Sequence, residues 1–530
     1  MAISKPIVLI ILDGWGETLE EKGNPFFQAN LPTIEKLNNF YPKLLLQASG
    51  LPVGLPWGVM GNSEVGHQTL GSGQIVYQNL PRITLAIENG DFFKNEHLVQ
   101  AMQKSKDEGK AFHIFGLLSN GSIHSHIDHI FATLEMAKEQ GLSNVFIHPI
   151  LDGRDAPQKS GIEFLQRLQE KMDSSGVGKI ASVAGRYNTM DRNENWDRTE
   201  KAFAAMTKKG ALVHTDPITA VQEQYGQEVF DEKIEPVTIV DGEGEPIGNI
   251  KEGDVVFFAN FRKDRAKQIS EAFTLPELDK FSENTPRPQN LFFITMVEYA
   301  KELPVSAIAF PPKSASFRLG EFLSQNGKKQ LRLAESEKYA HVTYFFNCGV
   351  ETAYEGEDRV LIPSKNASSY ADVPDMSAPE LTDRIIEEIE KDFYDFILVN
   401  YANPDMVGHT GDAQACIKTL ETTDKCLERI IPPVLQRSGA IMITADHGNV
   451  EELINLKSGE IDTEHSTNPV PFWLITAENH SEGGTPAMGD APGGILCDVA
   501  PTILDLMQIP IPPEVTGTSL LSFMEQVDMD

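Results

Sequence analysis

The chain has 530 residues, enough for more than one domain and an extensive hydrophobic core. It carries 77 acidic against 45 basic residues, a formal net charge of -32, and such a surface repels nucleic acid and anionic membranes. Its four cysteines form no C-x-x-C pair, and no apolar run approaches the ~20 residues of a membrane span, so we expect a cytoplasmic protein with no nucleic-acid or membrane partner.

The first strand-like run, IVLIIL at residues 7–12, leads directly into Asp13. An Asp in this place is usually a turn residue or a helix N-cap, so Asp13 alone indicates little. The segment GLPWGVMGNSEVGH at residues 54–67 places Ser63 in a glycine-flanked turn. It is neither a P-loop nor a nucleophile elbow, whose G-x-S-x-G spacing it misses by one residue. Ser63 becomes a candidate nucleophile only if a base or a metal activates its hydroxyl.

The string GSIHSHIDHI at residues 121–130 has the H-x-H-x-D-H spelling of a two-metal hydrolase site. Such a site needs further ligands downstream, and only scattered candidates such as His148 and His214 follow. We therefore interpret His124 as a substrate-facing residue and Asp128 as the start of a helix. His126 and His129 are interpreted as structural.

Strand-like runs in the middle of the chain end in arginine. The runs NVFIHPILDGRD, KIASVAGRYNTMDR and DVVFFANFRKDR contain Arg154, Arg186, Arg192, Arg262 and Arg265, with Asp155 beside the first. A single arginine is usually a solvated surface residue, but a guanidinium also matches carboxylate and phosphate groups geometrically. Five of them at strand ends in an acidic chain predict a clamp for a small, multiply charged anion.

Strand-like runs near the C-terminus end in carboxylates and imidazoles instead. The segments NYANPDMVGH, TADHGN and TEHSTNP supply Asp405, His409, Asp446, His447 and His465. Carboxylate oxygen suits hard divalent ions, and imidazole broadens the choice toward manganese, zinc or cobalt. These residues predict a metal site, although Pro and Gly around Asp405 favour a loop there.

The alternation of short apolar runs with helical stretches predicts the α/β class with largely parallel, doubly buried strands. Ligands of such sheets gather beyond the carboxyl ends of the strands. The acidic and the arginine strand ends occupy different parts of the chain. They predict two α/β domains: a metal-binding domain formed by residues 1–79 and 313–530, and an inserted substrate-binding domain formed by residues 80–312.

The chain resembles the cofactor-independent phosphoglycerate mutases of the alkaline phosphatase-like superfamily. The resemblance covers about residue 8 to beyond residue 510 and rests on LDGWG, GNSEVGH, HSHIDH, DGRD, GRYNTMDR, NFRKDRA, AESEKYAHVTYFFN, NYANPDMVGHTG and TADHGN, in that order. It implies an alkaline phosphatase-like metal domain with an inserted phosphotransferase domain. It also implies interconversion of 3-phosphoglycerate and 2-phosphoglycerate in glycolysis and gluconeogenesis, through a phosphoserine on Ser63 and without 2,3-bisphosphoglycerate.

The resemblance further implies two divalent metal ions, for which manganese is the usual metal. One would be held by Asp13, Ser63, Asp446 and His447, and the other by Asp405, His409 and His465. Lys338 would lie beside the phosphate, and the substrate would be bound by His124, Arg154, Asp155, Arg186, Arg192, Arg262 and Arg265. Whether Asp155 acts as a general base or only orients a hydroxyl stays open. We expect a monomer whose two domains close on the substrate about hinges near residues 80 and 310.

The chain departs from the family pattern at Trp57 and Val59, where smaller or more polar residues are expected, and at Cys348, where glycine is frequent. The main alternative function is a metal-dependent phosphatase or phosphodiesterase of the same superfamily. The arginine set argues against it, because hydrolysis requires access of water rather than retention of an alcohol. A non-catalytic phosphoglycerate-binding protein would be expected to lack Ser63 or a metal ligand, and a phosphopentomutase would need a clamp of sugar size.

Overall fold

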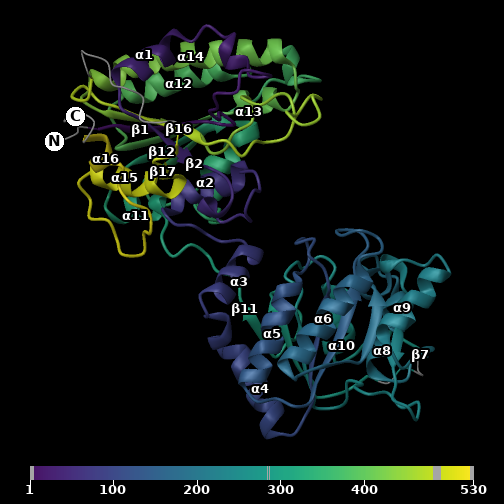
Figure 1. The fold of residues 1–530 in the computed structure, drawn as a ribbon. Coiled ribbons are helices and arrows are strands. Elements are labelled where there is room, and N and C mark those ends of the chain that lie inside the picture. Colours follow the sequence, from purple (N-terminus) through teal and green to yellow (C-terminus); the bar gives the residue numbers. More distant parts are fainter. Residues whose placement is uncertain (1–4, 283–284, 286, 481–490, 526–530) are drawn as a thin grey trace. The chain divides into compact units, whose positions relative to one another are not determined.

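The computed structural model describes residues 5–282, 285, 287–480 and 491–525, and the chain divides into two compact units. One unit combines Met1–Gln78 with Lys313–Asp530, and the other is the continuous segment Asn79–Pro312. We call them the split domain and the inserted domain. Each contains a sheet and helices (Figure 1), so the predicted α/β class is confirmed.

The split domain is built on a sheet whose described strands pair in the order β13-β12-β14-β1-β15-β16-β2-β17. β1 lies between β14 and β15, parallel to both, and only β16 runs antiparallel to its two neighbours. The strands are β1 (Ile7–Leu12), β2 (Lys43–Gln47), β12 (Gln330–Glu335), β13 (Glu357–Ile362), β14 (Phe396–Tyr401), β15 (Ala440–Thr444), β16 (Val470–Ile475) and β17 (Gly494–Ile495).

Helices cover both faces of this sheet. In Figure 1, α1 (Pro32–Phe40), α12 (Ala378–Glu390) and α14 (Ala413–Leu435) lie on one side, and α2 (Ser63–Ser72), α11 (Leu319–Gln325) and α15 (Val499–Leu506) lie on the other. Because both faces are covered, every residue of β1 is buried, which explains its uninterrupted apolar sequence. The remaining helices of the split domain are α13 (Asn403–Gly408) and α16 (Leu521–Glu525).

The inserted domain has its own sheet, with described strands in the order β11-β10-β9-β3-β4-β6-β8-β7 and β5 beside β4. All pairs are parallel except β6 with β8. The strands are β3 (Phe112–Leu117), β4 (Val145–Leu151), β5 (Lys179–Ile180), β6 (Ser182–Gly185), β7 (Leu212–His214), β8 (Val237–Ile239), β9 (Val255–Phe258), β10 (Phe292–Val297) and β11 (Ala307–Phe310).

The helices of the inserted domain pack around this sheet and complete a second hydrophobic core. They are α3 (Asn79–Glu88), α4 (Glu96–Asp107), α5 (Ile127–Glu139), α6 (Gly161–Ser175), α7 (Arg186–Thr189), α8 (Trp196–Thr207), α9 (Pro217–Gly226) and α10 (Lys267–Thr274). Across the described part of the chain, no helix combines the length and apolar character that crossing a membrane requires.

Parallel pairing brings the chemically active strand ends to one edge of each sheet. In the split domain, Leu12 pairs with Tyr401 and Ile11 with Thr444, so the segments that follow β1, β14 and β15 leave the sheet together. In the inserted domain, β9, β3, β4 and β6 are adjacent and parallel, and their carboxyl ends likewise meet. Each sheet therefore offers one edge for a ligand.

The three residues that depart from the family pattern lie outside the buried core. The Trp57 side chain is 85% exposed and Val59 is 42% exposed, so neither disturbs the packing of its loop. Cys348 has φ 54°, a left-handed backbone conformation that costs a residue with a Cβ but not glycine. This backbone requirement explains why glycine suits the position.

Candidate active site

Ser63 lies at the centre of the cluster at the edge of the split-domain sheet. Its Oγ is 3.0 Å from Nε2 of His447, 2.8 Å from Nζ of Lys338 and 3.2 Å from Oδ1 of Asp13. All four side chains are buried. An acid, a base and a nucleophile are therefore within contact distance in a site buried from water, where electrostatic interactions are strong.

The sequence around Ser63 forms the start of a helix rather than the flexible turn that we expected. Ser63 is the first residue of α2, and the side chain of Asn62 caps the helix by accepting a hydrogen bond from the Val65 amide at 3.0 Å. A Cβ at Gly66 would lie 2.5 Å from the carbonyl oxygen of Asp446, and one at Gly61 would lie 2.2 Å from that of Ala48. The glycines thus allow the helix start to approach the end of β15 closely.

Lys338 donates hydrogen bonds to two carboxylates that follow different strands, β1 and β14. Its Nζ donates to Oδ1 of Asp13 at 2.6 Å and to Oδ2 of Asp405 at 2.7 Å. Asp405 lies in helix α13, not in the loop that its Pro and Gly neighbours favour. With Asp446, the cluster holds three buried carboxylates against one ammonium group, an excess of negative charge that favours further cations, either protonated imidazoles or metal ions.

Three histidines present unprotonated nitrogens to the cluster when their rings are neutral. Nδ1 of His409 lies 2.8 Å from the Thr463 carbonyl oxygen, and Nδ1 of His465 lies 2.8 Å from that of Gly61. Nδ1 of His447 lies 3.2 Å from the carbonyl oxygen of its own neighbour, Gly448. A carbonyl only accepts, so each Nδ1 carries the proton and each Nε2 keeps its lone pair for a ligand.

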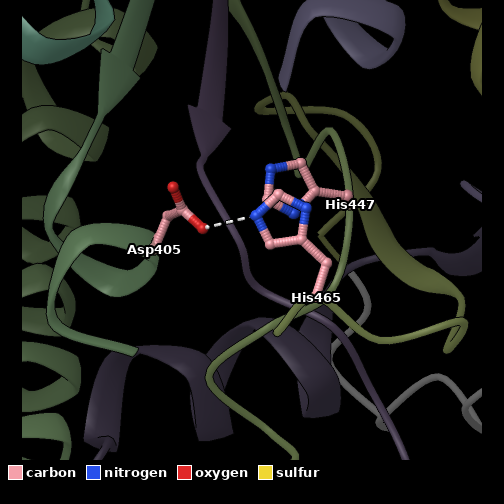
Figure 2. Close-up of side chains that lie close together, drawn as sticks. All are labelled: Asp405, His447 and His465. Carbon is pink, nitrogen blue, oxygen red and sulfur yellow. Dashed lines mark ion pairs between the residues drawn. The ribbon is translucent and has the colours of Figure 1, made fainter. Parts of the chain in front are cut away.

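The donor atoms form two groups that could each hold a metal ion. Asp405, His447 and His465 form one group (Figure 2), and Asp13, Asp446 and His447 form the other, with ligand atoms within 4.8 Å of one another in each. Nε2 of His409 lies 3.2 Å from Nε2 of His465. At that distance one ring can be protonated and donate to the other, as the pKa of His409, raised by its hydrogen bond to Asp405, favours, or a shared cation can take the place of that proton.

The carboxylate oxygens are also arranged to bind a metal ion. Oδ2 of Asp446 is buried and accepts no hydrogen bond among the described residues. Nδ1 of His67 is 3.2 Å from it but lies closer, at 2.8 Å, to the Ser63 carbonyl oxygen. Asp446, Asp405 and the imidazoles together supply the mixed oxygen and nitrogen ligands that suit manganese, cobalt or zinc. The residues present therefore fit a pair of divalent ions.

The pKa values of the site reflect this concentration of charge. Burial lowers the pKa of Lys338, but Asp13, Asp405 and Asp446 raise it by more than burial lowers it, so the pKa lies above its ordinary value. Burial lowers the pKa of His447 as well, yet the nearby carboxylates, Asp446 first, raise it to about 9. The pKa of Asp405 falls well below its ordinary value because the opposing attraction of Lys338 and the histidines exceeds the effect of burial.

A second charged cluster lies at the edge of the inserted-domain sheet. Nη1 of Arg186 donates to Oδ1 of Asp152 at 2.7 Å and to Oδ2 of Asp155 at 2.6 Å. Nη1 of Arg192 donates to Oδ2 of Asp264 at 2.8 Å, and Nε of Arg262 lies 3.2 Å from Oδ1 of the same residue. With Arg265 and with Arg154, which pairs with Glu232, the cluster has five guanidinium groups against four carboxylates and so suits an anion.

The other predicted residues of this domain belong to the same cluster. The pKa of Arg265 is lowered by burial and then by the charges of Arg192, Arg186 and Arg154, so these guanidinium groups repel one another. Arg154 also lies 3.5 Å from Glu232. In an electrostatic environment of this kind, a bound anion would relieve repulsion among the arginines.

His124 lies between two carboxylates of the cluster, with Nδ1 3.6 Å from Asp264 and Nε2 3.9 Å from Asp155. Its pKa is lowered to about 4, chiefly by burial and then by Arg186. The ring is therefore neutral at physiological pH and can donate one hydrogen bond while accepting another.

The H-x-H-x-D-H string does not form either metal group. His126 is the N-cap of α5 and accepts a hydrogen bond from the Asp128 amide at 3.3 Å, so the helix starts at Ile127 and not at Asp128 as we expected. His129 is buried, with Nε2 3.2 Å from the Thr84 hydroxyl. These contacts match the structural role that we predicted for His126 and His129.

The sequence interpretation missed several buried polar residues that touch the clusters. Asn400 donates to Asp13 at 2.6 Å, Asn449 donates to Asp405 at 2.7 Å, and Asp152 accepts from Arg186. His67 lies four residues after Ser63 on α2, a spacing that places the two side chains on one face of the helix. That i, i+4 relation within GNSEVGH was the one available signal.

Comparison with known proteins identifies the family of this chain. Residues 83–301 match the family described as the BPG-independent PGAM N-terminus. The 2,3-bisphosphoglycerate-independent phosphoglycerate mutase of Clostridium novyi (strain NT) is 46% identical over 516 residues, covering 97% of this chain and 99% of that protein. The protein of the same name from Clostridioides difficile (strain 630) is 45% identical over 520 residues, covering 98% and 100%.

A solved structure of Leishmania mexicana phosphoglycerate mutase at low cobalt concentration is 28% identical and covers 97% of each chain with a TM-score of 0.51. The relatives match the chain along both domains and across nearly their whole length. The chain belongs to the 2,3-bisphosphoglycerate-independent phosphoglycerate mutase family.

Proposed function

We propose that the protein interconverts 3-phosphoglycerate and 2-phosphoglycerate through a phosphoserine on Ser63, without 2,3-bisphosphoglycerate. The observation that carries this proposal is the environment of the Ser63 hydroxyl, which lies 3.0 Å from His447 and 2.8 Å from Lys338. The name shared by the relatives supports the substrate class. Phosphoryl transfer depends on positioning and charge stabilisation, and this cluster supplies both.

We propose that two divalent metal ions, manganese by preference, are bound in the split domain. Asp13, Ser63, Asp446 and His447 would hold one, and Asp405, His409 and His465 the other. The bound ions would lower the pKa of the serine hydroxyl and neutralise charge on the transferring phosphoryl group. The group of Asp13, Asp446 and His447 supports the first set of ligands. The second set is supported by Nε2 of His409 and of His465, which lie 3.3 and 3.4 Å from Oδ1 of Asp405.

Lys338 would contribute a fixed positive charge beside the nucleophile. Its raised pKa keeps the ammonium group protonated at any physiological pH. From 2.8 Å it can stabilise a Ser63 alkoxide, and after transfer it can donate to an oxygen of the phosphoserine. Asp13 and Asp405 fix its position from both sides.

The arginine cluster would hold glycerate after the first phosphoryl transfer, until the other hydroxyl of glycerate faces the phosphoserine. We propose that Arg154, Arg186, Arg192, Arg262 and Arg265, with His124, bind the carboxylate and phosphate groups of the substrate. A planar guanidinium matches both groups with paired hydrogen bonds. Retention of the alcohol distinguishes a mutase from a phosphatase, because an alcohol that escapes is replaced by water.

Asp155 would contact the glycerate hydroxyl, either as a general base or as an orienting acceptor. Its Oδ2 already accepts from Arg186 at 2.6 Å. An Asp155→Asn variant distinguishes the roles: loss of a base removes the acidic limb of the pH profile of kcat, whereas loss of an orienting group lowers kcat at every pH.

These assignments give each domain one task. We propose metal binding and phosphoserine formation for residues 1–79 and 313–530, and substrate binding for residues 80–312. We also propose a monomer in the cytoplasm, where the free state of all four cysteines would persist.

Purified protein supplied with 3-phosphoglycerate and manganese, and with no bisphosphoglycerate, tests the proposal directly. Formation of 2-phosphoglycerate is measured by a coupled enolase reaction, and inorganic phosphate is measured in the same samples. The proposal expects 2-phosphoglycerate without stoichiometric phosphate. Release of phosphate in its place would identify a metal-dependent phosphatase and overturn the mutase assignment.

A further inference from the structure

Asp13 is held in place by a chain of hydrogen bonds that leads back to the nucleophile's own backbone. The side-chain nitrogen of Asn400 lies 2.6 Å from Oδ2 of Asp13 and 3.1 Å from Nε2 of His67. Nδ1 of His67 lies 2.8 Å from the carbonyl oxygen of Ser63. All four residues are buried.

The hydrogen-bond directions in this chain are determined by its two ends. The Asp13 carboxylate only accepts, so the Asn400 atom facing it is the amide nitrogen. The second hydrogen of that amide points to Nε2 of His67, which must therefore carry a lone pair. The ring proton is then on Nδ1, where the Ser63 carbonyl accepts it. This arrangement gives both hydrogens of the Asn400 amide and the His67 ring proton an acceptor.

This chain divides the two oxygens of Asp13 between different tasks. Oδ2 is occupied by Asn400, whereas Oδ1 faces the reacting cluster, 2.6 Å from Lys338 and 3.2 Å from the Ser63 hydroxyl. Nδ1 of His67 is also 3.2 Å from Oδ2 of Asp446, the second carboxylate of the same metal group. Rotation of the Asp13 carboxylate would break the bond to Asn400, and both side chains are buried, so the loss would leave a buried polar group without its partner.

We propose that His67 and Asn400 are positioning residues that fix Asp13 and the start of α2 relative to each other, and so build the metal group of Asp13, Asp446 and His447 before any ion arrives. Neither side chain touches substrate or reacting atoms. The inference rests on the proposed function, since it assigns a task toward the divalent ion proposed there. Groups that orient metal ligands in this way typically change metal affinity by 10- to 100-fold when removed.

Three substitutions of His67 test separately its hydrogen bond to Asn400 and its hydrogen bond to the Ser63 carbonyl. In His67→Gln the side-chain oxygen can take the place of Nε2 and accept from Asn400. In His67→Asn the side-chain amide can take the place of Nδ1 and donate to the Ser63 carbonyl, but Asn400 loses its acceptor. His67→Leu removes both bonds at similar volume. Asn400→Leu removes the link from the other end.

Manganese binding to each protein is measured by calorimetric titration, together with kcat and KM for 3-phosphoglycerate. We expect wild type and His67→Gln to bind two ions with similar affinity. His67→Asn, His67→Leu and Asn400→Leu should bind one of the two ions 10- to 100-fold more weakly. In these three variants kcat should fall while KM stays near the wild-type value.

Leu70→Ala, a buried apolar truncation on the same helix, is the matched control for lost stability. It should lower the melting temperature without changing either manganese affinity. If the His67 and Asn400 variants keep both affinities, or if His67→Gln behaves like His67→Leu, the positioning role is wrong. A wild-type protein that binds no manganese and makes no 2-phosphoglycerate would instead overturn the proposed function.

Discussion

The ammonium nitrogen of Lys338 lies 2.8 Å from the hydroxyl oxygen of Ser63, although the two residues are 275 positions apart in the chain. The same nitrogen bridges Asp13 and Asp405. One buried cation thus contacts the nucleophile and a carboxylate from each of the two candidate metal groups. Its removal should affect chemistry and charge balance together.

Lys338→Met should lower kcat by roughly 100- to 1,000-fold, the usual loss for one preorganised donor to a transition state. The KM for 3-phosphoglycerate should change less than kcat, because five arginines and His124 are also proposed to bind the substrate. Steady-state kinetics with the enolase-coupled assay measures both constants. Lys365→Met is the matched control, since Lys365 is an exposed lysine of the same domain, 3.6 Å from Glu380. Equal activity of the two variants would contradict a role for Lys338 beside the phosphate.

Ser63→Ala should abolish turnover while preserving the fold, because the missing hydroxyl contributes little to packing at the start of α2. Rapid acid quench during turnover should trap a phosphorylated wild-type protein, and peptide mass spectrometry should place the phosphoryl group on Ser63. No such species should form in Ser63→Ala. Residual mutase activity with an intact melting transition would eliminate the phosphoserine mechanism.

Arg186→Met should destabilise the inserted domain by about 3–5 kcal/mol, because two carboxylates would lose their shared buried cation. The KM for 3-phosphoglycerate should also rise. Denaturant unfolding and steady-state kinetics measure the two effects. Lys201→Met, which removes an exposed ion pair with Glu235, should change stability by less than about 0.5 kcal/mol.

The metal-free protein should lose stability as the pH rises from about 6.5 to about 9. The folded pKa of His447 is about 9, above the value of about 6.5 in an unfolded chain. Because the folded pKa is raised, protonated His447 contributes its full stabilisation to the folded state below pH 6.5. This contribution to the free energy of unfolding, on the order of 3 kcal/mol, is lost as the pH rises past 9. Thermal melts of chelator-treated protein across this range measure it.

Manganese should reverse that trend, since a ligand must be unprotonated to bind and binding must displace the proton from His447. The melting temperature should therefore gain more from manganese at pH 9 than at pH 6.5. Proton release, measured by titration in buffers of different ionisation enthalpy, should accompany binding at pH 7. A metal-free protein whose stability is flat across this range would show that His447 is not held among carboxylates.

The inserted domain should show the opposite dependence and lose stability in acid. Burial lowers the pKa of His129 to about 3, and it also lowers the pKa values of His113 and His148, which lie 3.1 Å apart. A lowered histidine pKa stabilises the fold above pH 6.5, and the contribution is lost as the pH falls toward the folded value. Each such group removes up to about 1.4 kcal/mol per pH unit in that window.

Hydrogen exchange from pH 7 to pH 4.5 should therefore show the inserted domain opening before the split domain. His129→Gln should flatten the acid response, and the exposed His97→Gln should not. An identical acid response in all three proteins would assign the effect to other groups.

The sequence was sufficient for the strands and for the residues at their ends. IVLIIL is an uninterrupted apolar run, and FILVNY and AIMIT are apolar until their last one or two residues, because each strand is buried on both faces. This pattern can be recognised without a structure. Parallel pairing then brings Asp13 close to Asp446, as the three-strand register requires.

The supporting contacts could not be predicted in the same way. Asn400 lies inside β14, where a polar residue in a buried strand signals only that some partner exists. His67 lies on α2 behind Ser63, and its partner comes from a strand more than 300 residues later. Spacing along the sequence carries no information about such pairs, because only tertiary packing brings them into contact.

The local states of Ser63 and Asp405 were also not evident from composition. Glycines around Ser63 suggested a turn, whereas they allow a capped helix to lie against the end of β15. Pro and Gly around Asp405 suggested a loop, but Pro404 occupies the first turn of α13, where its missing amide hydrogen costs nothing.

The central place of β1 also affects how the protein is made. The Gly14 amide donates to the Asp446 side chain, 432 residues later in the sequence. β1 is synthesised first, and its neighbours β14 and β15 become available for pairing only when synthesis is nearly complete. The inserted domain is continuous and can finish its own sheet in the interval. A nascent or truncated chain therefore cannot assemble the metal-binding edge, and catalytic competence arrives only with the last strands.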